Sequence, residues 1–320
     1  MEVCQERYCS VVSRAAGEDP AGTAGSYGLF FLLEVPVPWE REIWKTPGFP
    51  DGLFDLAAAY QERGVSLRLL CIAPNPVHSR PGMRRLMILR RPEGPMARYE
   101  REEYLLPPGD VIGLIRATLD EAPTAPFAPY QVDVTGLRDL LVCTHGTVDA
   151  ACGRYGYPVY EQLRDRYASD SLRVWRVSHF GGHRFAPTLL DLPEGRWWAH
   201  IDPEALDALV HRTGPVGELR AKYRGWGALA TPFEQVLERE LFEREGWAWV
   251  DALKESQVLE RCPEGRWAEV RLGFRSPDGT HQGRYQGRVE VSHQVMTGLV
   301  SGKGPEPMPQ YRVTRLEPIG

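Results

Sequence analysis

The chain has 320 residues, of which 42% are hydrophobic and 25% charged, and its formal net charge is −5. These values predict a globular protein of about two domains, and the negative charge gives no overall field that attracts nucleic acid or an anionic membrane. Because no segment approaches about 18 consecutive apolar residues and the N-terminus is too polar for a signal peptide, we expect a cytoplasmic protein with no membrane or nucleic-acid partner.

The first part of the chain alternates the sequence patterns of strands and helices. In chain order these patterns predict a strand over 28–35, a helix over 51–64, strands over 65–73, 84–91 and 101–107, and a helix over 108–121. The stretch 121–130 is rich in Pro and Ala, which is the composition of a linker. It is the best candidate for a domain boundary.

The same order of elements recurs beyond the linker. The patterns predict a strand over 137–143, a helix over 157–168, strands over 172–178, 186–192 and 196–201, and a helix over 202–212. Two successive units with this order predict an α/β protein built from tandem thioredoxin-like domains with mixed sheets.

The last part of the chain has a different organisation. A helix is predicted over 233–246, followed by alternating, antiparallel-type strands over 266–275, 283–293 and 311–318. We therefore divide the chain into a thioredoxin-like N-terminal domain (1–125), a second thioredoxin-like domain (126–220) and a small α+β appendage of unassigned role (221–320).

Six cysteines, at positions 4, 9, 71, 143, 152 and 262, are too sparse for a disulfide scaffold. In a reducing compartment they are free thiols or metal ligands. Cys4 and Cys9 match no common zinc or redox spacing, so we place them in a disordered terminus. Cys71 and Cys262 are interpreted as packing residues.

Four potential metal ligands follow two strands of the second unit. Cys143 ends the strand 137–143, Cys152 is expected in the loop before the next helix, and His179 and His183 follow the strand 172–178. If these two strands are parallel neighbours, their C-terminal ends share one edge of the sheet, where open α/β sheets gather ligands. The quartet therefore predicts a metal centre.

Four further residues are candidates for the surroundings of that centre. Gly181 and Gly182 disfavour a helix between the histidines, so they predict a loop whose backbone approaches the metal closely. His145, two residues after Cys143, is a candidate for a rival ligand or for a hydrogen-bond donor to the ligands. Arg184, next to His183, is a candidate to donate a hydrogen bond or balance charge near the metal.

The types and spacing of these four residues are compatible with two metal groups. Two thiolates and two imidazoles suit zinc, although the eight residues between the cysteines exceed the usual zinc-finger spacing. A [2Fe–2S] cluster with both cysteines on one iron and both histidines on the other has the ligand set of Rieske centres. The wide spacing favours the larger group.

The motifs "CTHGTVDAACGRYG" (143–156) and "SHFGGHRFAPTLLDLPEG" (178–195) resemble the sucrase/ferredoxin-like family, as does "GTAGSYGLFFLLEVPVPWERE" (22–42). The resemblance extends over most of residues 1–225. It implies a thioredoxin-like [2Fe–2S] ferredoxin domain whose ligands are Cys143, Cys152, His179 and His183. It also implies that the protein transfers single electrons and is an electron carrier rather than a stand-alone enzyme. We expect its partner to be an unidentified redox protein, either a reductase or an electron acceptor.

Two other functions stay open. The first is a zinc-stabilised binding module that uses the same four residues. The second is a thiol oxidoreductase with Cys143 as nucleophile and Cys152 as resolving thiol, which the absence of a Cys-x-x-Cys arrangement disfavours. The first unit lacks a comparable pair of cysteines or histidines, so we expect it to bind no cluster.

Overall fold

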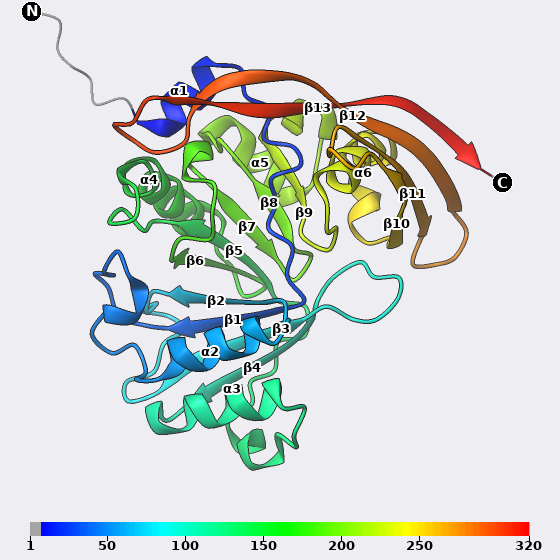
Figure 1. Ribbon diagram of the computed structural model, residues 1–320. Helices are drawn as coiled ribbons and strands as arrows, with labels where there is room; N and C mark the ends of the chain where they lie inside the picture. Colours follow the sequence, from blue (N-terminus) through cyan, green and yellow to red (C-terminus); the bar gives the residue numbers. More distant parts are fainter. Residues whose placement is uncertain (1–7, 320) are drawn as a thin grey trace, which may run out of the picture.

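One nine-stranded mixed sheet runs through the computed structural model, which describes residues 8–319 (Figure 1). Its strand order is β4-β3-β1-β2-β6-β5-β7-β8-β9. A separate four-stranded antiparallel sheet follows in the C-terminal part of the chain. Within residues 8–319, no helix combines the length and the apolar character needed to cross a membrane.

The first half of the large sheet is the predicted N-terminal unit. Its elements are β1 (Leu29–Glu34), α2 (Leu53–Glu62), β2 (Leu67–Ile72), β3 (Arg84–Arg90), β4 (Glu100–Leu106) and α3 (Val111–Leu119). Strands β1 and β2 are parallel, whereas β3 and β4 run antiparallel to their neighbours. Strand β1 is buried along its whole length, as its continuous apolar sequence requires.

The second half repeats this arrangement. Its elements are β5 (Arg138–Cys143), α4 (Ala150–Tyr167), β6 (Leu172–Val177), β7 (Leu189–Leu192), β8 (Arg196–Trp198) and α5 (Pro203–His211). Strands β5 and β6 are parallel, and β7 and β8 extend the sheet in antiparallel fashion. The prediction of an α/β protein with two thioredoxin-like units and mixed sheets is confirmed.

Helix α4 begins at Ala150 and not at residue 157, so the placement of Cys152 in a loop is wrong. The glycines and the proline of this segment suggested a later start. The side chain of Asp149 accepts a hydrogen bond from the backbone N–H of Ala151, and this N-cap starts the helix early. Cys152 therefore lies in the first turn of a helix.

The two units join edge to edge. Strands β2 and β6 meet at their C-terminal ends in an antiparallel bridge between Ile72 and Val177. Buried charges reinforce the junction: Arg173 of β6 donates hydrogen bonds to Glu103 of β4 (2.7 and 2.9 Å) and to Asp139 of β5 (2.8 Å). Both carboxylates are fully buried, so their free energy in the folded state depends on these partners.

Replacing Arg173 with Met should lower the free energy of unfolding by about 2 kcal/mol, because both buried carboxylates lose its charge-assisted hydrogen bonds, although Arg101 still pairs with each of them. Urea unfolding measures this change. Arg164→Met is the matched control, since Arg164 pairs with Asp165 on the exposed surface, and its effect should stay below about 0.5 kcal/mol. Equal effects of the two substitutions would contradict the role of the buried pair.

The C-terminal part contains α6 (Pro232–Glu245), β10 (Leu253–Arg261), β11 (Trp267–Arg275), β12 (Gln282–Gly298) and β13 (Pro305–Ile319). Helix α6 packs between the two sheets, with Leu237 and Val270 in one shared core. Strand β9 (Tyr223–Trp226) belongs to the large sheet, so the helix and antiparallel strands begin after it and not at residue 221. The sequence patterns missed both β9 and β10.

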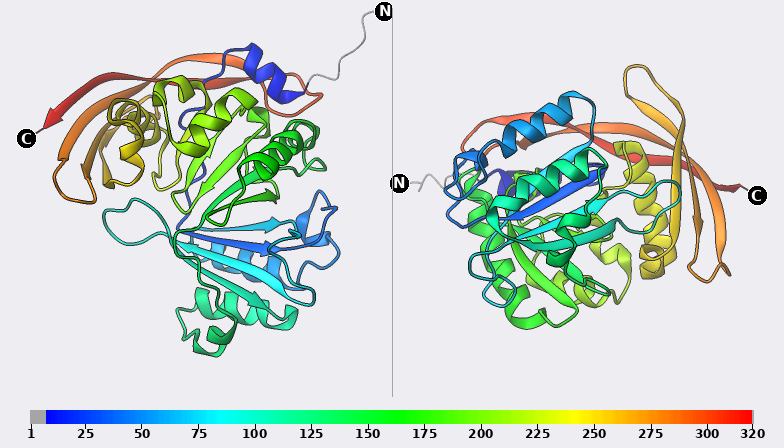
Figure 2. Two further views of the ribbon diagram at one scale, coloured as in Figure 1. Left: turned by 180° about the vertical axis from the view of Figure 1, so that it is seen from behind. Right: turned by 90° about the horizontal axis from the view of Figure 1, so that it is seen from below.

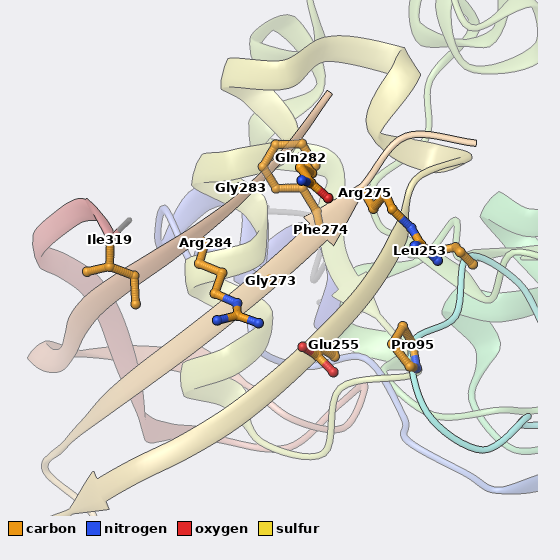
Figure 3. A pocket seen from close by; sticks show the side chains of 10 residues that line it. All are labelled: Pro95, Leu253, Glu255, Gly273, Phe274, Arg275, Gln282, Gly283, Arg284 and Ile319. Carbon is orange, nitrogen blue, oxygen red and sulfur yellow. The ribbon is translucent and has the colours of Figure 1, made fainter. Parts of the chain in front are cut away.

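Strands β12 and β13 are much longer than β10 and β11. Their far ends form a two-stranded arm that reaches across the molecule to α1 (Cys9–Ala15) near the start of α4 (Figures 1 and 2). Helix α1 was not predicted. It packs against this arm and against the second thioredoxin-like unit, although residues 1–125 were assigned to the first.

His200 is a histidine whose environment makes stability depend on pH. It is 6% exposed, and its ring lies edge-on to that of Phe185. Burial is the main cause that lowers its pKa from 6.5 to about 4. Its φ of 49° lies in the left-handed region, which Asn adopts more readily than most residues.

Because protonation of His200 favours the unfolded chain, its contribution to stability is complete above pH 6.5. We expect this contribution, about 3 kcal/mol, to be lost as the pH falls from 6.5 to about 4. Urea unfolding of the metal-free protein between about pH 7 and pH 4.5 tests the expectation. His200→Asn should show a smaller loss over this interval, and an unchanged loss would refute the assignment.

Candidate metal centre

The candidate centre lies at the C-terminal ends of β5 and β6. Cys143 is the last residue of β5, Cys152 lies in the first turn of α4, and His179 follows β6. Nδ1 of His179 is 3.9 Å from Sγ of Cys143 and 3.8 Å from Sγ of Cys152. The structure thus brings three of the four predicted ligands together, with all three ligand atoms within 4.8 Å of one another.

Close packing of α4 on β5 brings the two cysteines together. A Cβ atom on Gly156 would lie 2.0 Å from the carbonyl oxygen of Cys143, a distance that no side chain permits. At the start of the helix, a Cβ atom on Gly153 would lie 3.1 Å from Cα of Gly146, which is also a tight contact. Glycine is therefore required where the helix backbone crosses the end of the strand.

The pKa values of the two thiols shift in opposite directions in the metal-free protein. A hydrogen bond from Cys152 lowers the pKa of Cys143 well below its usual value, and His179 adds to this effect while burial opposes it. The same hydrogen bond, together with burial, raises the pKa of Cys152. The lowered pKa of Cys143 favours its thiolate, which is the form that binds metals.

His183 lies beside this group without joining it. It begins a short 3-10 helix (His183–Phe185), and its ring centroid is 5.3 Å from that of His179. Its Nδ1 lies 3.3 Å from Sγ of Cys9 and 3.4 Å from Oδ2 of Asp149. The fourth predicted ligand therefore has neighbours of its own that also offer metal-binding atoms.

Cys9 is fully buried in α1, so its placement in a disordered terminus is wrong. Its Sγ is 3.5 Å from Oδ1 of Asp149, and its backbone N–H donates to Oγ of Ser301. Burial raises its pKa to about 11. No spacing rule points to this residue, because its partners lie far along the chain, and Cys4 lies outside the described residues.

His145 supports the loop that carries His179. Its Nε2–H donates to the carbonyl of Glu40 (2.8 Å), and its Nδ1 accepts from the backbone N–H of His179 (3.2 Å). Both ring nitrogens are engaged, so the ring links the histidine loop to the first unit. The guanidinium of Arg184 instead pairs with Glu18 at 2.7 Å.

Gly181 and Gly182 have positive φ angles of 102° and 78°, which a loop of this shape requires. A Cβ on Gly182 would lie 2.7 Å from the guanidinium of Arg224. The sequence patterns missed Arg224, a buried residue of β9 whose Nη1 donates to the carbonyl of Gly181 at 3.0 Å. Burial lowers the pKa of Arg224 to about 9, and Coulomb attraction to Cys143 and Cys152 partly opposes this decrease.

Gly156→Ala should lower the free energy of unfolding by at least about 2 kcal/mol, because the new methyl group collides with backbone that cannot move aside. Gly113→Ala in α3 is the matched control. It should raise stability by up to about 1 kcal/mol, since the Cβ meets only the Phe127 ring at 3.4 Å and Ala favours a helix. Chemical denaturation of both variants provides the test, and a stable Gly156→Ala protein would argue against the close packing.

The fold and the site together define an α/β protein with two thioredoxin-like units and a cluster of cysteine and histidine side chains. The chain belongs to the sucrase/ferredoxin-like family, whose model matches residues 20–225. This match confirms the resemblance stated from the motifs.

No curated protein matches the chain. Similar solved structures include two cysteine-to-serine variants of the thioredoxin-like [2Fe–2S] ferredoxin from Aquifex aeolicus. Each is 17% identical, covers 26% of this chain and 96% of the ferredoxin, and has a TM-score of 0.23.

Proposed function

We propose that the protein binds a [2Fe–2S] cluster through Cys143, Cys152, His179 and His183 and transfers single electrons to or from a protein partner. The observation that carries this proposal is the convergence of two buried sulfur atoms on Nδ1 of His179, at 3.8 and 3.9 Å, with the ring of His183 alongside.

The side chains present fit such a cluster in their chemistry. Cys143 and Cys152 are free cysteines, and the lowered pKa of Cys143 favours the thiolate form that binds metals. Two thiolates and two neutral imidazoles are the ligand set of Rieske centres. When bound, the cluster supplies the one-electron chemistry, and its neutral imidazole ligands raise the reduction potential above that of a four-cysteine cluster.

The two cysteines of the proposed centre are more deeply buried than the two histidines. Cys143 and Cys152 are 1% and 0% exposed, whereas the side chain of His183 is 19% exposed. Electrons and protons therefore exchange most directly through the histidine side. We place the docking site of the redox partner over the loop that carries the two histidines.

Histidine ligands also couple the electron to a proton. A ring nitrogen that does not bind iron takes up a proton more readily when the cluster gains an electron. The reduction potential then falls as the pH rises. This behaviour suits either an electron carrier or a sensor that responds to both redox state and pH.

A zinc-stabilised binding module is the alternative that a specific observation favours. The ligand atoms of Cys143, Cys152 and His179 lie within 4.8 Å of one another, a spacing that one zinc ion also accommodates. Such a site is colourless and does not take up electrons. Metal identity separates the two functions.

Substitution of the cysteines tests the proposal. Cys143→Ser and Cys152→Ser should each lower the iron content per chain by at least about tenfold and remove the visible absorption of anaerobically purified protein. Cys262→Ser is the matched control, because this buried cysteine lies beside the antiparallel sheet and pairs with Glu264. Full colour in both ligand variants would rule out the proposed ligands.

A further inference from the structure

Three segments that are far apart in the chain meet beside His183. Helix α1 contributes Cys9, the N-cap of α4 contributes Asp149, and the turn between β12 and β13 contributes Ser301. Figures 1 and 2 show the arm of β12 and β13 reaching over α1 near the start of α4. The inference drawn from this meeting point rests on the proposed function, because it concerns how His183 binds iron.

Asp149 is surrounded by donors. Its carboxylate accepts hydrogen bonds from Oγ–H of Ser301 (2.6 Å), from the backbone N–H of Ser301 (2.9 Å) and from the backbone N–H of Ala151 (2.9 Å). Sγ of Cys9 lies 3.5 Å from Oδ1. A carboxylate in this setting only accepts, so the contact with Cys9 requires the thiol proton.

This requirement fixes the hydrogen bond between Cys9 and His183. A thiol has one proton, and here it is directed to Asp149. Neither Sγ of Cys9, at 3.3 Å, nor Oδ2 of Asp149, at 3.4 Å, then has a proton to give to Nδ1 of His183, so both are acceptors for Nδ1–H. The opposite direction would set sulfur lone pairs against the carboxylate and leave that contact without a proton.

We propose that Cys9 and Asp149 are positioning residues that hold His183 as the Nδ1–H tautomer and leave Nε2 to bind iron. His179 differs, because its Nδ1 faces the two cysteine sulfurs. The two histidines therefore use different nitrogens: Nδ1 of His179 and Nε2 of His183. A partner that accepts from a ligating imidazole makes the ring a stronger donor, which lowers the reduction potential of the metal.

The proposal also assigns a role to the C-terminal arm. Ser301 contacts both oxygens of Asp149, and its Oγ accepts from the backbone N–H of Cys9. A Cβ on Gly298 would lie 3.1 Å from Cβ of Val12, so the arm packs closely on α1. The arm thus keeps Cys9 and Asp149 in place beside His183.

The ring nitrogens of His183 report the tautomer directly. Nitrogen-15 NMR of the metal-free protein at neutral pH should show a proton on Nδ1 of His183 in the wild type, with His183→Gln used to assign the signal. Cys9→Ala combined with Asp149→Asn should remove this preference, because Sγ of Cys9 and Oδ2 of Asp149 are both acceptors near Nδ1. Cys9→Ser in the wild-type background should retain it, because serine also accepts. An Nε2–H tautomer in the wild type, or an unchanged tautomer in the protein that carries both Cys9→Ala and Asp149→Asn, would overturn the proposal.

The reduction potential gives a second readout on the cluster-loaded protein. Cys9→Ala and Asp149→Asn should each raise the potential, because His183 loses a partner that makes it a stronger donor. Asn retains the helix cap. Cys262→Ala and Asp202→Asn are matched controls, the latter at the N-cap of α5, and neither should shift the potential.

The two readouts separate this inference from the proposed function. A wild-type protein that binds no iron yet shows the Nδ1–H tautomer would contradict the function and support the hydrogen-bond assignment. A loaded protein whose potential is the same in wild type, Cys9→Ala and Asp149→Asn would overturn the positioning role and leave the cluster in place.

Discussion

The contact between Gly156 of α4 and the carbonyl of Cys143 is the constraint on which the candidate centre depends. It lets the helix cross the end of β5 without a side chain between them, and this crossing sets Cys152 beside Cys143. The early N-cap by Asp149 has the same effect, because it winds Cys152 into the first turn of the helix. Two features of backbone packing thus place two buried thiols together, and the hydrogen bond between them lowers the pKa of Cys143 and raises that of Cys152.

The histidine side of the centre depends on the rest of the molecule. His145 links the His179 loop to Glu40 of the first unit, and Arg68 of β2 donates to the carbonyl of His179 at 2.9 Å. Arg224, from β9, holds the carbonyl of Gly181. The first unit therefore contributes hydrogen bonds to the loop.

Features formed by residues close together in the chain could be predicted from the sequence. The continuous apolar run of β1 and the repeated order of elements predicted the α/β fold with two units. The spacing of the cysteines and histidines pointed to Cys143, Cys152 and His179, which the structure brings together. The edge-to-edge junction of β2 and β6 was not predictable, because it depends on side chains such as Arg173 and Glu103 that meet only after folding.

The same limit applies to the site. Cys9, Arg224 and Ser301 carry no local signature, and each reaches the centre from a segment that periodicity assigns to another part of the molecule. The start of α4 was misplaced for a different reason. Helix propensity penalises Gly153 and Gly156, whereas the tertiary contacts at these positions require them.

The most direct test of the central claim is the iron, acid-labile sulfide and zinc content of anaerobically purified protein, measured together with its visible spectrum before and after dithionite. The account predicts about two irons and two sulfides per chain and a spectrum that bleaches on reduction. One zinc per chain, with neither sulfide nor visible absorption, would contradict it.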